Sequence, residues 1–489
     1  MVDKVLFDGK ARLLLGDCLS RLKDLPDNSV DSIVTDPPYG LGTPPDPVVV
    51  MKAWVEEGSA EVSGKGFMGK DWDAFVPQPV VWRECFRVLK PGGHLLCFSG
   101  TRTQDWMAMS LRFAGFEIRD LLAWTYGSGF PKSHNIGMAV DRLEGNEREV
   151  GELKFKGGTQ LGIINDDNWK PKDVYETKGH SAWEGWGTAL KPALEPITLA
   201  RKPLSESTIA QNVLRWGTGG INIDENRIPF ANETDQQIST DKNRHADFNS
   251  NEGIRVPTQG IYHGDNRPPE NYDGNKGRFP ANLVHDGSPE VLELFPDANG
   301  GSFPEKRGSS AFLGLGDAEN RSAFTGSMGD HGSAARFFYC AKTSSAEREL
   351  GLEHLQLNTD NLQGLDTRGR TLEREDGSKT LVERWQAAPR VNNHPTVKPI
   401  SLMRWLVRLI TPKEGVVLDP FVGSGSTGVA ALIEGFSFVG IDLSEDYLEI
   451  ATGRITAFRE YDAITSNSPV PSPTDSQKTM EHFFGGKQK

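Results

Sequence analysis

The chain has 489 residues, 37% of them hydrophobic and 25% charged, a composition that excludes a disordered chain lacking a hydrophobic core. Its formal net charge of −13 argues against a protein that coats nucleic acid without specificity, although local basic patches are compatible with it. No apolar run approaches the roughly 20 residues of a membrane span, and the first residues do not resemble a signal peptide, so we expect a cytoplasmic protein without a membrane partner.

Cysteine and histidine are too scattered to predict a metal site. The four cysteines form no CxxC pair, and the ten histidines show no spaced set of ligands such as HExxH. Neither a structural zinc site nor a disulfide framework is therefore expected. We predict ordinary thiols and no metal.

The first zone of the chain, up to about residue 204, alternates apolar runs with helical patterns. Short apolar runs predict buried strands at 13–15, 32–35 and 95–98. Residues 81–90 predict a helix that Pro91-Gly92-Gly93 ends. Strands that alternate with helices indicate an α/β fold with a mostly parallel sheet.

The second zone, from 205 to about 390, is rich in Gly, Asn, Asp and Pro. Stretches such as 232–251 and 360–377 have the composition of long surface loops. Loops of this length are unusual inside a compact domain, so an inserted functional module is the better interpretation.

The α/β pattern resumes from about residue 391. It predicts helices at 401–410, 427–434 and 446–458, with strands at 415–418 and 438–441. From residue 462 the chain is polar and contains Ser and Pro, which is typical of a disordered tail.

A glycine-rich loop follows the strand at 415–418. Gly423, Gly425 and Gly428 fit the pattern GxGxxG, and Asp442 ends the next strand about 20 residues later. Glycines let the backbone approach a ligand closely, and a carboxylate at the end of the second strand accepts hydrogen bonds from ribose hydroxyls. The loop therefore predicts a site for a cofactor that contains a nucleoside.

The residues between this strand and the glycines favour one cofactor over another. In dinucleotide sites the glycines follow the strand almost directly, and the helix N-terminus faces a pyrophosphate. Here Asp419-Pro420-Phe421 intervenes. A carboxylate would repel a pyrophosphate but suits a ligand with cationic groups, so the loop favours S-adenosylmethionine over NAD.

A second motif, Asp36-Pro37-Pro38-Tyr39, follows the predicted strand at 32–35. Turns at the carboxyl ends of strands are where α/β folds place their sites. The prolines fix the backbone and supply no N–H donor, so the Asp36 carboxylate and the Pro37 carbonyl can both act as acceptors, while Tyr39 offers a flat ring. The tetrad suits a planar ligand with an exocyclic amino group, although an ordinary turn would also fit this motif alone.

Together these motifs resemble the amino-methylating DNA methyltransferases of bacteria and phages. The order is that of the circularly permuted β-type, in which the catalytic tetrad precedes the cofactor loop. The resemblance covers roughly 10–204 and 336–457 and is looser over 205–335. The segments that carry it are Gly16-Asp17-Cys18, Leu25 to Asp31 with the tetrad that follows, Glu195-Pro196-Ile197 with Lys202, Phe337 to Lys342, His394 to Pro399 and the 419–428 loop.

The resemblance implies a fold and a division of the chain. It implies a Rossmann-like methyltransferase sheet, circularly permuted, with an inserted target-recognition region. The expected parts are a catalytic part at 1–204, the inserted region at 205–335, a cofactor-binding part at 336–461 and a disordered tail at 462–489.

The resemblance also implies contacts with S-adenosylmethionine. Asp442 is expected to bind the ribose hydroxyls and Asp17 to lie near the cofactor adenine, although Asp17 is also placed to cap a helix. Thr396 and Lys398 are expected to meet the methionine carboxylate, unless Lys398 is an ordinary surface lysine. The residues expected to line the rest of the cofactor are Asp419, Phe421, Gly423 and Gly425.

The implied reaction is direct methyl transfer to an amino group of a base flipped out of duplex DNA. Tyr39 would stack on the base, while Asp36 and the Pro37 carbonyl would accept the two amino hydrogens. Most relatives with aspartate in the tetrad methylate adenine N6, so Asp36 favours a site-specific adenine enzyme over a cytosine-N4 enzyme.

Three aromatic residues before Pro131-Lys132-Ser133 and several side chains of the insertion suggest roles in substrate binding. Trp124, Tyr126 and Phe130 are candidates for the flipped-base pocket, with core packing an equal alternative. In the insertion, arginine and asparagine side chains can pair with purine edges in the major groove. The pairs considered for target recognition are Arg215-Trp216, Asn226-Arg227 and Arg278-Phe279.

Two other classes of function compete with a DNA methyltransferase. One is a methyltransferase that acts on a nitrogen of RNA or protein, and the other is a non-catalytic DNA-binding module that has kept the fold. The motif order argues against the first and the intact tetrad against the second. The expected partner is double-stranded DNA. The sequence leaves open whether the protein is a homodimer and whether a cognate restriction endonuclease is paired with it.

Overall fold

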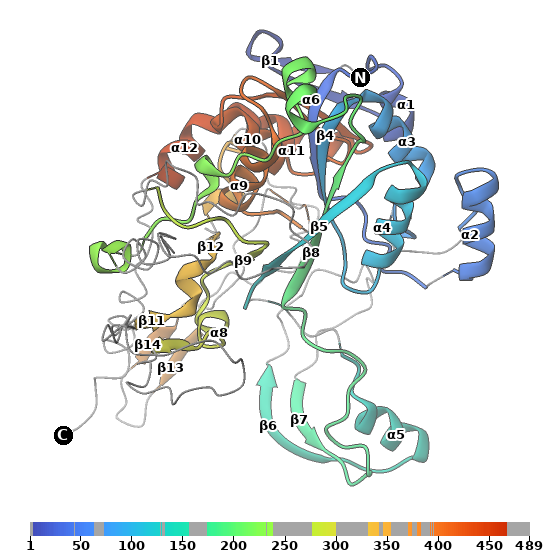
Figure 1. Cartoon of the computed structure of the whole chain (residues 1–489). Coiled ribbons are helices and arrows are strands. Elements are labelled where there is room, and N and C mark those ends of the chain that lie inside the picture. The colour runs from blue at the N-terminus through green and yellow to red at the C-terminus, as the bar shows by residue number, and fades with distance from the viewer. Residues whose placement is uncertain are drawn as a thin grey trace, which may run out of the picture.

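A central sheet of ten strands forms the core of the computed structural model (Figure 1). The structure describes residues 3–43, 45–62, 73–127, 129, 133–155, 174–230, 232–237, 276–299, 331–341, 346–353, 370–373, 379–382, 392, 394 and 396–466. The sheet strands are β1 (Lys4–Leu6), β2 (Ala11–Leu15), β3 (Val30–Thr35), β4 (Leu89–Phe98), β5 (Glu117–Thr125), β8 (Leu194–Arg201), β9 (Leu283–His285), β12 (Tyr339–Cys340), β15 (Val416–Asp419) and β16 (Ser437–Asp442).

The strand order interleaves the two ends of the chain. It runs β1-β2-β16-β15-β3-β4-β8-β5-β9-β12, so β15 and β16 lie between β2 and β3. β15 pairs with β3 in parallel, and β16 pairs with β2 in parallel. β8 is antiparallel to both of its neighbours, β4 and β5. This is the predicted α/β, Rossmann-like sheet, and its strands are contributed in permuted order.

Helices cover both faces of the sheet. Their bounds are α1 (Cys18–Leu22), α2 (Pro47–Glu56), α3 (Pro79–Val88), α4 (Gln104–Phe113), α5 (Ile136–Glu144), α6 (Ile209–Trp216), α8 (Pro289–Leu292), α9 (Ile400–Ile410), α10 (Ser426–Ile433), α11 (Glu445–Thr456) and α12 (Phe458–Ser466). In Figure 1, α9 to α12 lie on one side of the sheet and α1, α3 and α4 on the other.

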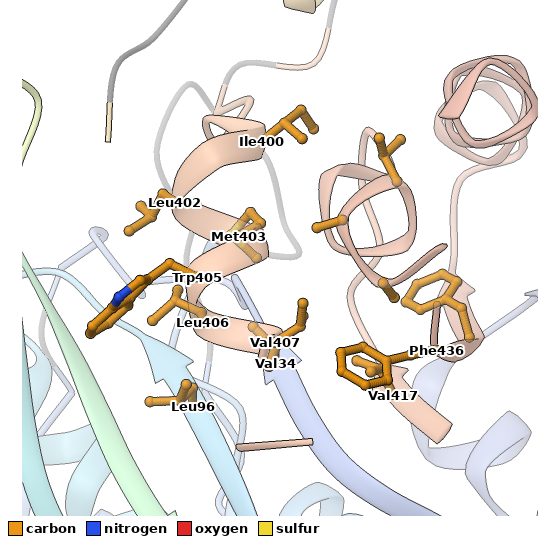
Figure 2. Close-up of a cluster of buried hydrophobic side chains, with 14 of the residues drawn as sticks. Val34, Leu96, Ile400, Leu402, Met403, Trp405, Leu406, Val407, Val417 and Phe436 are labelled. Atoms are coloured by element: carbon orange, nitrogen blue, oxygen red, sulfur yellow. The ribbon is translucent and has the colours of Figure 1, made fainter. Parts of the chain in front are cut away.

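Side chains that point alternately to the two faces of the sheet form two hydrophobic cores. Val34 and Leu96 belong to the core beneath α9 and α10, whereas Ile33 and Leu95 belong to the core beneath α1 and α3. Successive strand residues point to opposite faces, so a continuous apolar run supplies both cores at once. Figure 2 shows α9 above Val34 and Leu96, with its Trp405 and Leu406 packed toward the sheet.

Smaller elements surround the sheet. An arm formed by α5, β6 (Glu149–Phe155) and β7 (Val174–Lys178) projects from it (Figure 1). Arg148 fastens this arm through ion pairs with Asp141 and Glu184. Two further antiparallel pairs are β10 (Asp297–Asn299) with β11 (His331–Ser333) and β13 (Arg370–Glu373) with β14 (Lys379–Val382).

Most predicted elements are present, with differences at three places. Pro91-Gly92-Gly93 was expected to follow a helix end directly, but it lies inside β4, because α3 already ends at Val88. The predicted insertion at 205–335 contributes β9 to the central sheet, so part of it belongs to the core.

The third difference concerns the tail. The expected boundary at 462 falls inside α12, which continues to Ser466. The buried Tyr461 anchors this helix, since its hydroxyl contacts the carbonyls of Glu347 and Leu350. The remaining tail residues, 467–489, lie outside the described part of the chain, as do most of the long loops predicted at 232–251 and 360–377.

Candidate active site

The predicted site residues meet at one edge of the sheet. β3 ends at Thr35 just before the tetrad, β15 ends at Asp419, and β16 ends at Asp442. These strands are parallel, so their carboxyl ends lie along the same edge, where open α/β sheets bind ligands. β8 runs in the opposite direction, so its beginning, with Glu195, lies at this edge too.

Asp36 lies in a group of four polar side chains. The Tyr39 hydroxyl donates to Asp36 Oδ1 at 2.8 Å and lies 2.9 Å from Glu195 Oε2. Lys398 forms an ion pair with Asp36 Oδ2, and its Nζ lies 3.4 Å from Glu195 Oε2. The side chain of Lys398 is only 6% exposed and that of Asp36 15%. Two carboxylates thus share one ammonium and the Tyr39 hydroxyl in a largely dry setting, and the Tyr126 hydroxyl also interacts with Glu195.

This setting shifts the pKa values of Asp36, Lys398 and Tyr39. Burial raises the pKa of Asp36. The Lys398 ammonium acts in the opposite direction and Glu195 in the same direction as burial, and the pKa of Asp36 is raised as a result. Burial alone would lower the pKa of Lys398, but the two carboxylates outweigh it and the pKa is raised. The pKa of Tyr39 is raised well above its usual value by burial and by both carboxylates. Near neutral pH, Lys398 is therefore a cation and Tyr39 a neutral hydrogen-bond donor.

The turn that carries the tetrad is fixed at its far end. Thr103 Oγ1 donates to the Tyr39 carbonyl at 2.6 Å, and Asp73 Oδ1 accepts the N–H of Gly40 at 2.9 Å. Gly40 has φ +65, and a Cβ there would lie 2.7 Å from the backbone nitrogen of Val76. Only glycine fits this position without displacing backbone.

Asp419 ties the cofactor loop to the strand of the tetrad. Its Oδ1 accepts from Thr35 Oγ1 at 2.7 Å and from the N–H of Phe421 at 3.1 Å, and its Oδ2 accepts from Thr427 Oγ1 at 2.5 Å. Burial raises its pKa to about 6, although the hydrogen bonds from Thr427 and Thr35 act in the opposite direction. The carboxylate, which was expected to line the cofactor, is occupied by internal donors in this structure.

The glycine loop is shaped by Asp442. Asp442 Oδ2 accepts the N–H of Gly423 at 2.8 Å, and Oδ1 accepts the N–H of Ser444 at 2.8 Å. Gly423 has φ +49, and a Cβ there would lie 2.6 Å from His394 Nε2. The loop backbone can therefore pass this close to the His394 ring only while position 423 carries no side chain.

The other predicted cofactor residues lie nearby with different exposure. Asp17 is exposed and caps α1 by accepting the N–H of Ser20 at 3.0 Å, which is the alternative role considered for it. Thr396 is exposed, whereas Phe421 is half-buried. The Phe421 ring packs edge-on against Trp82, with the two ring centroids 6.2 Å apart. Lys398 is not a surface lysine, and in this structure it pairs with Asp36.

A family model described as DNA methylase matches residues 30–144 and 328–453 of this chain. These two spans contain the tetrad and the glycine loop respectively. The chain belongs to the N6/N4 DNA methylase family. The family uses S-adenosylmethionine as its methyl donor.

Curated relatives of this chain are similar to it over short segments. The chain is 44% identical over 64 residues to the type II methyltransferase M.ScaI of Streptomyces caespitosus, over 13% of this chain and 21% of that protein. It is 43% identical over 79 residues to the type II methyltransferase M2.DpnII of Streptococcus pneumoniae, over 16% of this chain and 28% of that protein. The matched segments thus span less than a third of these relatives.

Solved structures of DNA methyltransferases cover more of the chain at low similarity. A complex of M1.HpyAVI with S-adenosylmethionine aligns with 91% of this chain and 98% of its own, at 14% identity and a TM-score of 0.33. The cytosine-N4-specific PvuII DNA methyltransferase aligns with 91% of this chain and 86% of its own, at 11% identity and a TM-score of 0.35.

The pairs considered for target recognition are mostly engaged elsewhere. α6, which carries Arg215 and Trp216, lies at the opposite edge of the sheet, where Asn212 and Thr218 donate to the carbonyl of Pro91 at the beginning of β4. These two residues therefore do not face the site.

The other two pairs are also held by internal contacts. Asn226 is buried, and its carbonyl lies 3.4 Å from Trp405 Nε1. Arg278 forms an ion pair with Asp235 and is 12% exposed. Of this set, the ring of Phe279 is the most open, at 65% exposure.

Sequence reasoning assigned no role to Glu195, which the structure places beside Asp36. Its signal was the segment Glu195-Pro196-Ile197, noted only as part of the family resemblance. The antiparallel register pairs Glu195 with Trp124, so both lie on the same face of the sheet. Trp124 is 8% exposed, and its ring centroid lies 5.0 Å from that of Tyr126. The Trp124 Nε1 has no acceptor among the described residues. Phe130, the third aromatic considered, lies outside the described residues.

Neither a metal cluster nor a membrane span is found where the structure describes the chain. Its described residues include no group of three or more His, Cys, Asp or Glu that could hold a metal ion. None of the described helices is both long and apolar enough to cross a membrane.

Proposed function

We propose that this protein transfers the methyl group of S-adenosylmethionine to N6 of adenine at specific sites in double-stranded DNA. The observation that carries the proposal is the 2.7 Å hydrogen bond from Thr35 to Asp419. It joins the last residue of β3, which leads into the tetrad, to the last residue of β15, which leads into the glycine loop. An acceptor pair for an amino group and a loop for a nucleoside cofactor are thus held side by side.

The tetrad supplies acceptors for an amino group. The lone pair of an adenine amino nitrogen is delocalised into the ring, which makes it a weak nucleophile. Asp36 and the Pro37 carbonyl would accept the two amino hydrogens, localise the lone pair and aim it at the methyl group. A charged acceptor held in a buried site is a strong electrostatic aid, because little reorganisation is needed during the reaction. Positioning supplies much of the remaining rate enhancement.

The residues of the glycine loop fit S-adenosylmethionine, which supplies an electrophilic methyl group on a sulfonium. A Cβ at Gly423 would collide with His394, so the glycine lets the loop backbone take its course beside that ring, where it can face the cofactor. Each Asp442 oxygen accepts one backbone N–H and retains a lone pair for a ribose hydroxyl. Asp17, at the end of the neighbouring strand β2, would lie near the cofactor adenine.

The base would enter between Tyr39 and two aromatic residues at the end of β5, Trp124 and Tyr126. Trp124 and Tyr126 lie on the same face as Glu195, and the unpartnered Trp124 Nε1 is a donor for a ring nitrogen of the base. Flipping the base out of the duplex would bring its amino group to Asp36. The proposal assigns target recognition to the insertion at 205–335 apart from β9, which belongs to the central sheet.

Adenine is favoured over cytosine by Asp36 in the tetrad and by one further relative. The chain is 35% identical over 71 residues to the DNA adenine methyltransferase YhdJ of Escherichia coli (strain K12), over 14% of this chain and 24% of that protein. Cytosine N4 is the second candidate acceptor, since the geometry of an acceptor pair and a flat ring suits either amino group.

Product analysis tests the proposal. The purified protein is incubated with S-adenosylmethionine and unmethylated duplex DNA, and the DNA is digested to nucleosides for mass spectrometry. The expected product is N6-methyl-2′-deoxyadenosine. N4-methyl-2′-deoxycytidine would retain the transferase and overturn the assignment of the base, and the absence of any methylated base would overturn the proposed function.

A further inference from the structure

Both oxygens of Asp36 already have a donor before any substrate binds. Oδ1 accepts from the Tyr39 hydroxyl and Oδ2 is paired with Lys398. An amino group that binds Asp36 must compete with these two donors. A carboxylate paired with an ammonium is also a weaker acceptor, because the cation draws its negative charge. Without substrate, therefore, the Asp36 carboxylate is occupied by internal donors and is not yet available to an amino group.

Glu195 lies within reach of both donors. Its Oε2 is 2.9 Å from the Tyr39 hydroxyl and 3.4 Å from Lys398 Nζ. A hydroxyl carries one hydrogen, so Tyr39 donates fully to only one of the two carboxylates at a time. A small displacement exchanges one acceptor for the other and leaves no buried donor unsatisfied.

We propose that Glu195 is a positioning residue that takes over the Tyr39 hydroxyl and the Lys398 ammonium when the amino group of the target base binds Asp36. This inference rests on the proposed function and adds a residue to it. The exchange leaves the total charge of the site unchanged, since two carboxylates still face one ammonium. Before the exchange Lys398 neutralises Asp36, and after it Lys398 neutralises Glu195, so that Asp36 keeps its full negative charge.

The charge on Asp36 is useful during transfer. As the bond from N6 to the methyl carbon forms and the bond from sulfur to that carbon breaks, sulfur keeps the electron pair and becomes a neutral thioether. The nitrogen becomes positive, and one of its hydrogens leaves as a proton to Asp36. An Asp36 released from Lys398 stabilises the positive nitrogen and accepts its proton more readily.

The fold explains why Glu195 can serve both donors. β8 is antiparallel to β4, so its beginning lies at the edge where β3 ends. Glu195 is the second residue of β8, and it is 19% exposed. It is therefore attached to a rigid strand that is independent of the turn carrying Asp36, which lets it hold a donor while that turn accommodates a base.

Two variants of Glu195 and one control test the proposal in the full-length protein. Glu195→Ala removes the acceptor, and Glu195→Gln keeps its shape and an acceptor oxygen without the charge. Glu117→Gln is the control, because Glu117 is a carboxylate on the neighbouring strand β5 that pairs with Arg201 at the far edge. Single-turnover methylation of unmethylated duplex DNA is measured at saturating S-adenosylmethionine, with the cofactor Kd and the Tm of each protein.

The expected rate loss is about 100-fold for Glu195→Ala and about tenfold for Glu195→Gln, on the scale of other lost electrostatic contacts. The cofactor Kd, the Tm and the rate of Glu117→Gln stay near the wild-type values. Glu195→Gln also moves the acid limb of the pH profile to lower pH, because Glu195 no longer raises the pKa of Asp36. The other titratable groups around Asp36, which this variant leaves in place, are Lys398, Tyr39, Cys97 and Asp419.

The outcomes separate this inference from the proposed function. If the wild type methylates adenine and both Glu195 variants match its rate and pH profile, the inference is wrong and the function stands. If the rates fall only in parallel with the Tm and with no change in the acid limb, Glu195 is structural and the inference is again wrong. If the wild type methylates no base, the proposed function fails and the inference fails with it.

Discussion

At the scale of single residues, the site depends on how a buried carboxylate is balanced by its neighbours. Asp36 faces one cation, one hydroxyl and a second carboxylate, and all of them lie in surroundings of low exposure. Charges interact strongly in such surroundings. Changes of one atom at Asp36 should therefore alter chemistry far more than they alter binding of the cofactor.

Asp36→Asn should nearly abolish methyl transfer while S-adenosylmethionine still binds. Asparagine keeps the size of the side chain but loses the negative charge that stabilises the methylated nitrogen. We expect a loss of at least about 100-fold in single-turnover rate, with the cofactor Kd measured by calorimetry changed by less than about threefold. Transfer near the wild-type rate would show that Asp36 is not the acceptor.

The pH dependence of the wild type should report the raised pKa of Asp36. The carboxylate accepts amino hydrogens only when ionised, and burial together with Glu195 raises its pKa above the ordinary 3.8. kcat/KM should therefore fall as the pH drops through that raised pKa, which places the acid limb above pH 3.8. The measurement is a pH profile over the range in which circular dichroism shows the protein folded.

Gly423→Ala should weaken cofactor binding. Alanine at φ +49 is strained by about 1 to 2 kcal/mol, and its Cβ would also meet His394 at 2.6 Å. We expect the Kd for S-adenosylmethionine to rise about tenfold or more. Gly435→Ala is the matched control, since Gly435 has φ +83 but nothing within 4 Å of the added Cβ, and it should lose only stability.

At the scale of secondary-structure elements, the contact between β3 and β15 is the one that assembles the site. The two strands come from opposite ends of the chain, and their last residues, Thr35 and Asp419, are joined by a buried hydrogen bond. The tetrad and the glycine loop begin directly after these residues, so this contact fixes the separation between the two loops.

Thr35→Val should therefore affect both stability and catalysis. The substitution keeps the shape of the side chain but removes a donor to a buried carboxylate, which costs about 1 to 3 kcal/mol. Urea unfolding should show this loss, and methylation should slow because the two loops shift. Thr456→Val, at an exposed position of α11, should change the stability by less than about 0.5 kcal/mol. Equal effects of the two substitutions would contradict the role given to this contact.

At the scale of the whole molecule, the interleaved sheet joins distant segments of the chain, so we expect them to unfold together. β15 and β16 lie between β2 and β3, and the residues proposed to bind the cofactor come from both ends of the chain. A cofactor that bridges them should stabilise the whole sheet, since binding to the native state alone shifts the unfolding equilibrium.

Saturation with S-adenosylmethionine should shift a single unfolding transition. At a concentration 100 times its Kd, the ligand should add about 2.7 kcal/mol to the free energy of unfolding, and dialysis should remove this gain. The measurement is urea unfolding followed by tryptophan fluorescence and by circular dichroism. Separate transitions, with only one shifted by the ligand, would show that the two ends of the chain fold independently.

The parts of the site that local sequence determines were predictable. The apolar run before Asp36 forms β3, and the run before Asp419 forms β15, because continuous apolar segments must be buried on both faces. The glycines at 423 and 425 take positive φ, as a tight turn between strand and helix requires. These features depend on residues close together in the chain, so their patterns can be read directly.

The partners of these motifs were decided by tertiary structure. Lys398 was expected at the methionine carboxylate, yet it lies against Asp36, 362 positions away in the chain. Arg215 has the chemistry of a DNA contact but lies on α6 at the opposite edge of the sheet. Neither placement follows from composition, because it depends on which strand pairs with which and in which direction.

The sequence by itself thus determined the kind of sheet, the two motifs and the class of cofactor, since each is encoded by apolar periodicity and by residues with restricted backbones. Tertiary structure alone decided that Glu195 joins the site. The segment Glu195-Pro196-Ile197 contributes to the family resemblance, but nothing near Glu195 in the chain assigns it a role in the active site. It reaches Asp36 because β8 runs antiparallel to β4, which turns the start of one strand toward the ends of the others.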